Sequence, residues 1–437
     1  MIRPTIRTVL IFAGGIPLAL IAVIYDPGLW PMAGSYAVLV LLAAAFDLVL
    51  AVQPGMLDIK TTIPGKLHIG ERGAVTAEIA PLRYRRSVDL DVLADQRGEV
   101  EPVGPVSATI PAGQKVEVTL AVLPRRRGRV HVDRLWIRWR GPLGLMEFVR
   151  RIPLDREIDV LPNVRGVHGT ALQFFLREAI HGIKTQLQGG EGTEFDALRE
   201  FMPGFDSRFI DWKHSARHRR LLCKEFRTER NHHVMMAFDT GYLMLEPIEG
   251  ITRLDHAINA GLALAWVSLQ AGDLVGSFGF DAAVRQYVGP SRGLTSLARI
   301  ERATAELAYH HQETNFTLGL AELNLRLKRR ALVILFTDFV DTITAELLIE
   351  SMQRLANRHV VVFVTQRGSV LENAVEAAPT RFLDVAQAVV AQNFLRERRI
   401  VFERLERLGV HCIDVPIRSL ASALINRYLM IKQRGLI

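Results

Sequence analysis

Two apolar runs close to the N-terminus constrain the fold of this 437-residue chain most strongly. Residues from Val9 to Tyr25 carry no charge, and residues from Met32 to Val52 carry only Asp47. Each run approaches the length that crosses the roughly 30 Å hydrocarbon core of a bilayer. The sequence Asp-Pro-Gly-Leu-Trp-Pro at 26–31 is typical of a turn with an interfacial Trp. These features predict a transmembrane helical hairpin over residues 1–53.

A cleaved signal peptide is the alternative interpretation, because Arg3 and Arg7 precede the first apolar run. A second run that follows so closely favours the hairpin, and in either case the bulk of the chain lies on the same side. Basic residues flank both outer ends, with Lys60 following the second run, whereas the short loop has no Lys or Arg. The positive-inside rule therefore predicts that both termini are cytoplasmic.

The overall composition agrees with a membrane-anchored chain. Hydrophobic residues make up 49% and the mean hydropathy is +0.16, with the excess concentrated at the N-terminus. The net charge of +8 suits the inner face of an anionic membrane, and it would also suit a nucleic-acid binder. Membrane attachment favours the first. Cys223 and Cys412 lie too far apart in the sequence to suggest a disulfide framework or a Cys-x-x-Cys metal site.

Residues 54–165 have the pattern of a small β-sandwich. Strand-like runs separated by turn residues occur at 74–79, 88–93, 115–120 and 135–139. The Arg run in Pro-Arg-Arg-Arg-Gly at 124–128 could bind acidic lipid or RNA, but such a run is more typical of a solvated turn between strands.

Residues 166–231 form a linker that is dense in glycines, paired charges and aromatics. Its arginines can make bidentate pairs with nearby carboxylates. One interpretation is an internal ion-pair lattice that packs the linker onto the next domain, and the other is a surface for an acidic partner. The motif residues are Glu194, Leu198, Arg199, Pro203, Gly204, Arg208, Asp211, Trp212 and Arg217.

Residues 232–437 alternate between apolar strands and amphipathic helices. The expected strands are 234–238, 274–280, 285–288, 331–337, 360–365 and 411–415, and the expected helices are 253–271, 293–310, 344–358 and 385–408. Such a pattern predicts an α/β domain with a mostly parallel, doubly wound sheet. Ligands of these sheets bind at the carboxyl ends of strands, where Asp239 and Asp338 fall.

The linker motif, together with Pro-Arg-Arg-Arg-Gly at 124–128 and Gly-Pro-Leu-Gly-Leu at 141–145, resembles the domain of unknown function 58 family. Members are bacterial membrane proteins with a von Willebrand factor A-like domain. The resemblance implies such a domain at 232–437, a location in the bacterial inner membrane, and a MoxR-type AAA+ ATPase and other membrane proteins of the same system as partners. The chain departs from the family pattern at Phe205, where an Asp usually follows Pro-Gly.

The same resemblance implies a metal edge. Von Willebrand A-like domains often carry an Asp-x-Ser-x-Ser turn, a loop Thr and a second Asp, all hard oxygen ligands for Mg²⁺. The corresponding residues here are Asp239, Gly241, Leu243, Thr314 (with Thr317 as the second choice) and Asp338. Two serines are lost, so we expect no cofactor. Mg²⁺ remains the alternative if a partner supplies the missing ligand.

No motif assembles a catalytic constellation, and Cys223 lies in a strand-like stretch that predicts a structural role. The sequence therefore predicts a membrane-anchored, cytoplasm-facing interaction or scaffold protein and not an enzyme. The alternatives are a metal-dependent hydrolase at the Asp239/Asp338 edge and a nucleic-acid-binding protein that uses its Arg clusters, although no nucleic acid is expected.

Overall fold

The computed structural model describes residues 1–25, 30–81, 87–98, 100–101, 103–163, 194–202, 206–227, 231–339, 342–368 and 381–437. The chain divides into two compact units, Met1–Leu161 and Pro162–Ile437. The first unit holds the apolar helices and the strands expected for the sandwich. The second holds the linker motif and the α/β domain.

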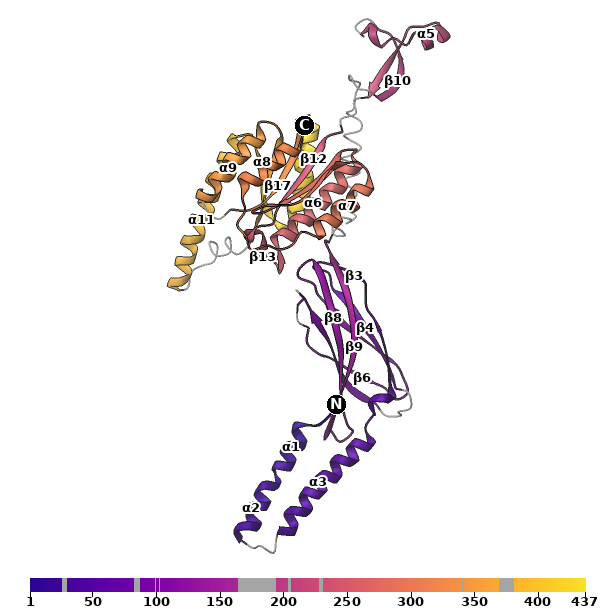
Figure 1. Cartoon of the computed structure of the whole chain (residues 1–437), viewed down its shortest axis with the longest axis vertical. Helices are drawn as coiled ribbons and strands as arrows, with labels where there is room; N and C mark the ends of the chain where they lie inside the picture. Colours follow the sequence, from indigo (N-terminus) through magenta and orange to yellow (C-terminus); the bar gives the residue numbers. More distant parts are fainter. Residues whose placement is uncertain are drawn as a thin grey trace. The chain divides into compact units, whose positions relative to one another are not determined.

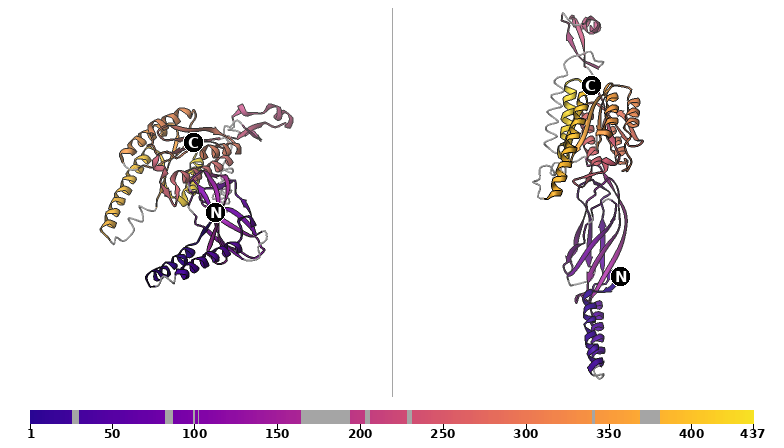
Figure 2. Two further views of the ribbon diagram at one scale, coloured as in Figure 1. Left: turned by 60° about the horizontal axis from the view of Figure 1, so that its bottom comes forward. Right: turned by 90° about the vertical axis from the view of Figure 1, so that its left-hand side faces the viewer.

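The apolar runs form three helices, α1 (Ile6–Ala13), α2 (Gly15–Tyr25) and α3 (Trp30–Leu50). The first two lie beside the third (Figures 1 and 2). The Tyr36 hydroxyl of α3 donates to the Ile11 carbonyl over 2.6 Å, and the Tyr36 ring lies where a side chain at Gly15 would need to be. Four residues of the expected turn, 26–29, lie outside the described part of the chain.

The two apolar runs are not equivalent. Within the described residues one helix, Trp30–Met56, is long and apolar enough to cross a membrane, whereas the first run forms shorter helices. The first run is interrupted at Gly14, whose N–H bonds back to the carbonyls of Leu10 and Ile11 and closes α1. The sequence predicted two comparable spans, whereas the described residues contain one helix of spanning length and two shorter apolar helices.

The strands of the first unit form two sheets with alternating buried and exposed side chains. One has the order β1-β9-β8-β5-β6, with β3 also on β9, and the other has the order β2-β4-β7. Their bounds are β1 (Ile2–Pro4), β2 (Leu57–Thr62), β3 (Lys66–His68), β4 (Gly73–Pro81), β5 (Val88–Arg97), β6 (Val106–Ile110), β7 (Val116–Val122), β8 (Gly128–Arg140) and β9 (Met146–Leu161).

Strand β1 was not expected from the sequence. It precedes the first apolar helix and pairs antiparallel with β9, with Ile2 opposite Phe148. The N-terminal amino group also donates to the Val149 carbonyl over 2.8 Å. Because β2 follows α3, strands of this unit flank the apolar helices on both sides in the sequence.

Asp47 joins helix α3 to the loop between β8 and β9. Its side chain is fully buried, and its two carboxylate oxygens accept the backbone N–H groups of Leu143, Leu145 and Met146 over 2.7–2.9 Å. A Cβ atom at Gly141 would approach this carboxylate to 2.5 Å, so the close contact needs glycine there. The one charge of the second apolar run is thus an internal anchor.

The linker motif forms a small hairpin. Strand β10 (Glu194–Glu200) pairs antiparallel with β11 (Leu222–Arg227), and the short helix α5 (Trp212–His218) lies between them in sequence. Asp211 begins the helix by accepting the His214 N–H over 3.1 Å, as an N-cap residue does.

The α/β domain is built on one six-stranded sheet of order β16-β15-β12-β17-β18-β19. Five of its strands are parallel, and the edge strand β16 runs antiparallel to β15. The strands are β12 (His233–Asp239), β15 (Leu274–Phe280), β16 (Val284–Ser291), β17 (Ala331–Phe336), β18 (Val360–Arg367) and β19 (His411–Pro416).

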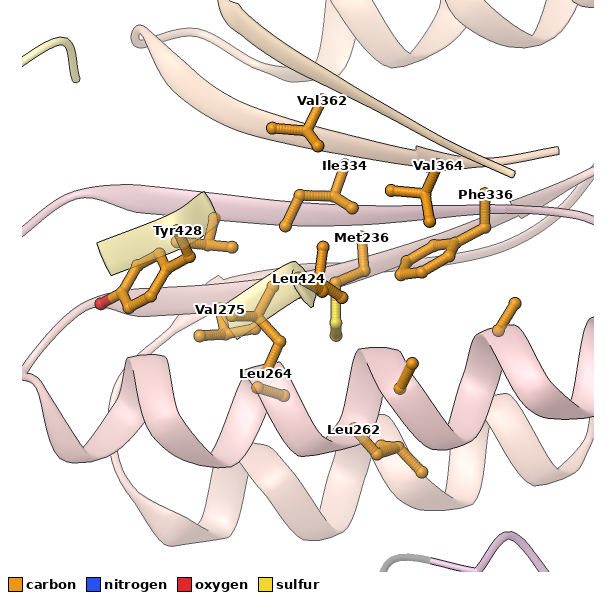
Figure 3. Packing of buried hydrophobic residues seen from close by; sticks show 14 of the residues in the cluster. Met236, Leu262, Leu264, Val275, Ile334, Phe336, Val362, Val364, Leu424 and Tyr428 are labelled. Carbon is orange, nitrogen blue, oxygen red and sulfur yellow. The ribbon is translucent and has the colours of Figure 1, made fainter. Parts of the chain in front are cut away.

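Helices cover both faces of this sheet. On one face Met236, Ile334 and Phe336 pack against α6 (Arg253–Gln270), α7 (Leu294–Ala305) and α12 (Ile417–Gln433), as Figure 3 shows in part. On the other face the core continues into α8 (Phe316–Arg326), α9 (Thr342–Ala356) and α11 (Phe382–Arg407). Helix α7 ends five residues before the expected His310, and α8 and α12 were not expected.

Candidate functional site at the strand ends

Asp239 and Asp338 lie at the carboxyl ends of two adjacent parallel strands. Asp239 is the last residue of β12, whose register with β17 places Phe238 opposite Phe336. Asp338 follows two residues after Phe336. Because β12 pairs with β15 on one side and β17 on the other, the strand order reverses here. The sequence therefore placed both aspartates correctly, at the position where open α/β sheets bind ligands.

Asp239 is buried and accepts three hydrogen bonds. One carboxylate oxygen accepts from the Gly241 N–H over 2.8 Å and from the Thr314 hydroxyl over 2.6 Å. The other accepts from the Thr337 hydroxyl over 2.5 Å. Burial raises the pKa of Asp239 to about 6, although these hydrogen bonds favour the charged form.

The structure brings Asp239, Gly241 and Thr314 together. Thr314, the first choice for the loop threonine, contacts Asp239, while Thr317 is exposed on α8. A Cβ atom at Gly241 would collide with the Thr314 hydroxyl, so the space for a serine hydroxyl is already filled. Leu243 lies half-buried in a short 3₁₀ turn, Tyr242–Leu245, and supplies no oxygen ligand from its side chain.

Asp338 is held by two arginines. Arg253 on α6 and Arg398 on α11 donate to its separate carboxylate oxygens over 2.8 and 2.7 Å, and the Phe339 N–H donates over 2.9 Å. All three charged side chains are about nine-tenths buried. Arg398 also pairs with Asp414 over 3.3 Å. Neither arginine was expected, because both lie far from Asp338 in the sequence.

A third carboxylate, Asp281, directly follows Phe280, the residue that pairs with Asp239 on the neighbouring strand β15. It accepts two bonds of 2.8 Å from the Arg285 guanidinium and one of 3.1 Å from the Thr240 hydroxyl. Burial opposes its ionisation, but the bonds from Arg285 and from the backbone of Ala283 lower the pKa of Asp281 below its usual value. Its charge in turn contributes to the raised pKa of Asp239.

These residues do not fit a tightly bound Mg²⁺ ion. Both oxygens of Asp239 already accept hydrogen bonds, and both oxygens of Asp338 are paired with guanidinium groups. Mg²⁺ needs near-octahedral oxygen ligands. Within the described ranges, no three His, Cys, Asp or Glu side chains cluster in a way that could hold a metal.

The motif residues of the hairpin make local contacts, in which Asp211 is buried whereas Arg208 and Trp212 are exposed. Arg208 pairs with Asp206 over 2.7 Å, and its side chain is 83% exposed, so this pair is not the buried one that a structural lattice requires. Backbone and ring hydrogen bonds from His214, with Lys224 at 3.2 Å, hold the pKa of Asp211 well below its usual range. Trp212 is 69% exposed.

Other motif residues are placed less completely. Leu198 is half-buried on β10, and Arg199 and Arg217 are exposed. Pro203, Gly204 and the side chain of Glu194 lie outside what the structure describes. Cys223 is buried on β11, where burial raises the pKa of its thiol, in agreement with the structural role that the sequence predicted.

Comparisons with known proteins identify one part of the chain. Residues 197–379 match the family model described as "Protein of unknown function DUF58". No curated protein matches. Among solved structures, proximal thread matrix protein 1 from the mussel byssus is 13% identical at a TM-score of 0.25, over 45% of this chain and 46% of its own. A beta-glucosidase from Listeria innocua is 15% identical at a TM-score of 0.16, over 24% and 16%.

The chain spans about half the length of the mussel protein, and neither likeness is close enough to carry an argument about fold or function. The family match, in contrast, covers most of the linker motif and both aspartates of the strand-end site. Residues 197–379 therefore match the domain of unknown function 58 family, which the linker motif resembles.

Proposed function

We propose that this protein is a membrane-anchored, cytoplasm-facing interaction module whose α/β domain docks a partner protein at the strand-end edge around Asp239. The observation that carries the proposal is that the carboxylates at that edge already have hydrogen-bond partners within the domain. Arg253 and Arg398 donate to Asp338, and Thr314 and Thr337 donate to Asp239. An edge that satisfies its own carboxylates is better suited to presenting a fixed surface than to metal-dependent hydrolysis.

The strand order supports a von Willebrand A-like assignment for the domain. The sheet is mostly parallel, has one antiparallel edge strand and carries helices on both faces. Its strand order changes direction at β12, the first strand of the sheet in the sequence, which agrees with the doubly wound class. In this interpretation the turn after Asp239 is a metal-binding turn rebuilt by Gly241 and Leu243. The rebuilt turn exposes Tyr242, which is 46% accessible and suited to an interface.

Strand β1 supports a membrane hairpin. Ile2–Pro4 precedes the apolar helices and Leu57–Thr62 follows them, and both belong to the same unit. A chain that leaves these strands through α1 and α2 therefore returns to them through α3. Cleavage of a signal peptide would remove β1 from its pairing with β9. The basic residues outside the hairpin loop support the proposal that both termini lie in the cytoplasm, at the bacterial inner membrane.

The family resemblance makes a MoxR-type AAA+ ATPase the partner to test first, with other membrane proteins of the same system next. A photo-crosslinking residue replaces Tyr242 in the full chain, which is co-expressed with the ATPase. The matched control replaces Leu325, which is 75% exposed near the C-terminal end of helix α8. A crosslink from position 242 alone supports the proposal. Equal crosslinking from both positions, or none, contradicts it.

A second candidate function rests on helix α5. Trp212 is exposed next to Lys213 and five residues before Arg217 on the same helix, which combines a stacking surface with positive charge. Binding of single-stranded RNA that weakens steeply with salt and is lost in Trp212→Ala would favour this candidate. Binding that does not depend on Trp212 would reject it.

A further inference from the structure

A polar cavity of about 560 Å³ opens on the first unit, beside the junction of its strands and its apolar helices. Its walls come from β5, β6 and β8 and from the loop at 141–144. Arg7 of α1 and Val52, two residues after the end of α3, also line it. The cavity therefore lies at the boundary between the apolar helices and the polar strands.

The wall of the cavity carries a net positive charge. Three arginines, at 7, 138 and 140, face two aspartates, at 89 and 91, which leaves one excess positive charge. Arg138 is already engaged by Asp91 over 2.7 Å, and Asp89 accepts the Thr109 hydroxyl over 2.6 Å. Arg7 and Arg140 make no ion pair within the described ranges, although the charge of Arg140 contributes to the lowered pKa of Asp91, and both side chains are exposed.

Arg7 and Arg140 lie on the side of the cavity nearest the apolar helices. Arg7 is in the first turn of α1, with its guanidinium 3.7 Å from the position that a Cβ at Gly144 would take. Arg140 ends strand β8, directly before the loop that Asp47 of α3 holds. Leu143 of that loop is half exposed, so an apolar side chain accompanies the two charges.

We propose that this cavity binds the phosphodiester headgroup of an anionic phospholipid, with Arg7 and Arg140 as its phosphate ligands. Arginine is suited to bidentate phosphate recognition, and the single excess charge matches the single negative charge of phosphatidylglycerol. Asp89 and the hydroxyls of Ser107 and Thr109 then face the polar end of the headgroup. The acyl chains lie along α1 and α3. The inference rests on the proposed membrane anchoring and adds a ligand to it.

The test uses the full chain, purified in mild detergent and stripped of lipid. Native mass spectrometry measures the binding of phosphatidylglycerol and of phosphatidylethanolamine with identical acyl chains. The test variant carries Arg7→Gln with Arg140→Gln. The control is Arg134→Gln, an exposed arginine on the same strand β8 that does not line the cavity. Thermal melting confirms that the two variants are equally folded.

We expect the native chain and the control to bind phosphatidylglycerol about tenfold more tightly than phosphatidylethanolamine, and the double variant to lose that preference. Equal binding of the two lipids by the native chain overturns the inference, as does an unchanged preference in the double variant. Displacement of phosphatidylglycerol by an equal concentration of inorganic phosphate overturns the lipid assignment.

Membrane fractionation separates this inference from the anchoring on which it rests. If the native chain fractionates with membranes but shows no lipid preference, the cavity inference fails and the anchoring stands. If the native chain is absent from membranes, the anchoring and the inference fail together.

Discussion

At the scale of single residues, Asp239 should make the stability of the α/β domain depend on pH. Its pKa rises from 3.8 in the unfolded chain to about 6 because it is buried. Between these values the folded protein holds a proton that the unfolded chain has released, so stability falls as pH rises. The shift of about 2 units corresponds to about 3 kcal/mol.

Asp239→Asn removes this titration while keeping an acceptor for Gly241 and Thr314. The stability of the variant relative to the native chain should therefore rise by about 2 kcal/mol between about pH 4 and about pH 6.5, measured by urea unfolding. Burial lowers the pKa of His359 to about 4, which changes stability with the opposite sign in this window. That contribution is common to both proteins and cancels in the difference. A constant difference would mean that Asp239 is charged throughout.

Gly241 allows a second residue-scale prediction. Gly241→Ser would place an atom against the Thr314 hydroxyl, so we expect a loss of about 1–3 kcal/mol and no gain of Mg²⁺ affinity. Gly289→Ser is the control, because the nearest atoms to its Cβ position lie 3.7 Å away. Thermal melting measures the loss of stability, and melting with millimolar Mg²⁺ measures metal binding. An ion present at about 100 times its Kd would add roughly 2.7 kcal/mol to the stability of the folded protein. Stabilisation of Gly241→Ser by Mg²⁺ would show that a metal site had been restored.

At the scale of elements, the attachment of helix α3 to the loop at 141–145 depends on Asp47. The carboxylate accepts three backbone N–H groups, and an Asn side chain offers only one oxygen for them. Hydrogen bonds to a charged group contribute about 1.5–3 kcal/mol each, so Asp47→Asn should destabilise the first unit by about 3 kcal/mol.

Thermal unfolding of the full chain in detergent measures the effect of Asp47→Asn, followed by the β-sheet signal in circular dichroism. Asp58→Asn, an exposed change on β2, removes the same charge from the same unit without touching these bonds. Equal melting of the two variants would show that the loop does not depend on the helix for its stability.

At the scale of the whole molecule, the proposed membrane hairpin leads to a prediction about which side of the membrane holds the α/β domain. Strand β1 precedes α1 and strand β2 follows α3, so the proposed hairpin would return the chain to the side on which it starts. A reporter fused after Ile437 should be active when it is of the cytoplasmic type and silent when it requires the periplasm. Activity of the periplasmic type would contradict the topology and the proposed partner together.

The local pattern of the sequence was enough to predict most strands and helices. Alternating burial in β4 and β8, and the apolar runs of β12 and β17, are properties of neighbouring residues. The positions of Asp239 and Asp338 followed from those strands, because parallel strands end at the same edge of a sheet. Strand β1 was missed because three residues are too few to show a period.

The partners of the charged side chains could not be read in this way. Arg253 and Arg398 lie 85 and 60 residues from Asp338, and Asp47 lies 96 residues from Leu143. Each pair meets only because the helices pack on their sheet or loop in one register. The family resemblance therefore implied a metal edge weakened by the loss of two serines. In the structure the carboxylates of that edge are held by hydrogen bonds and ion pairs, because a buried carboxylate must find donors wherever the fold supplies them.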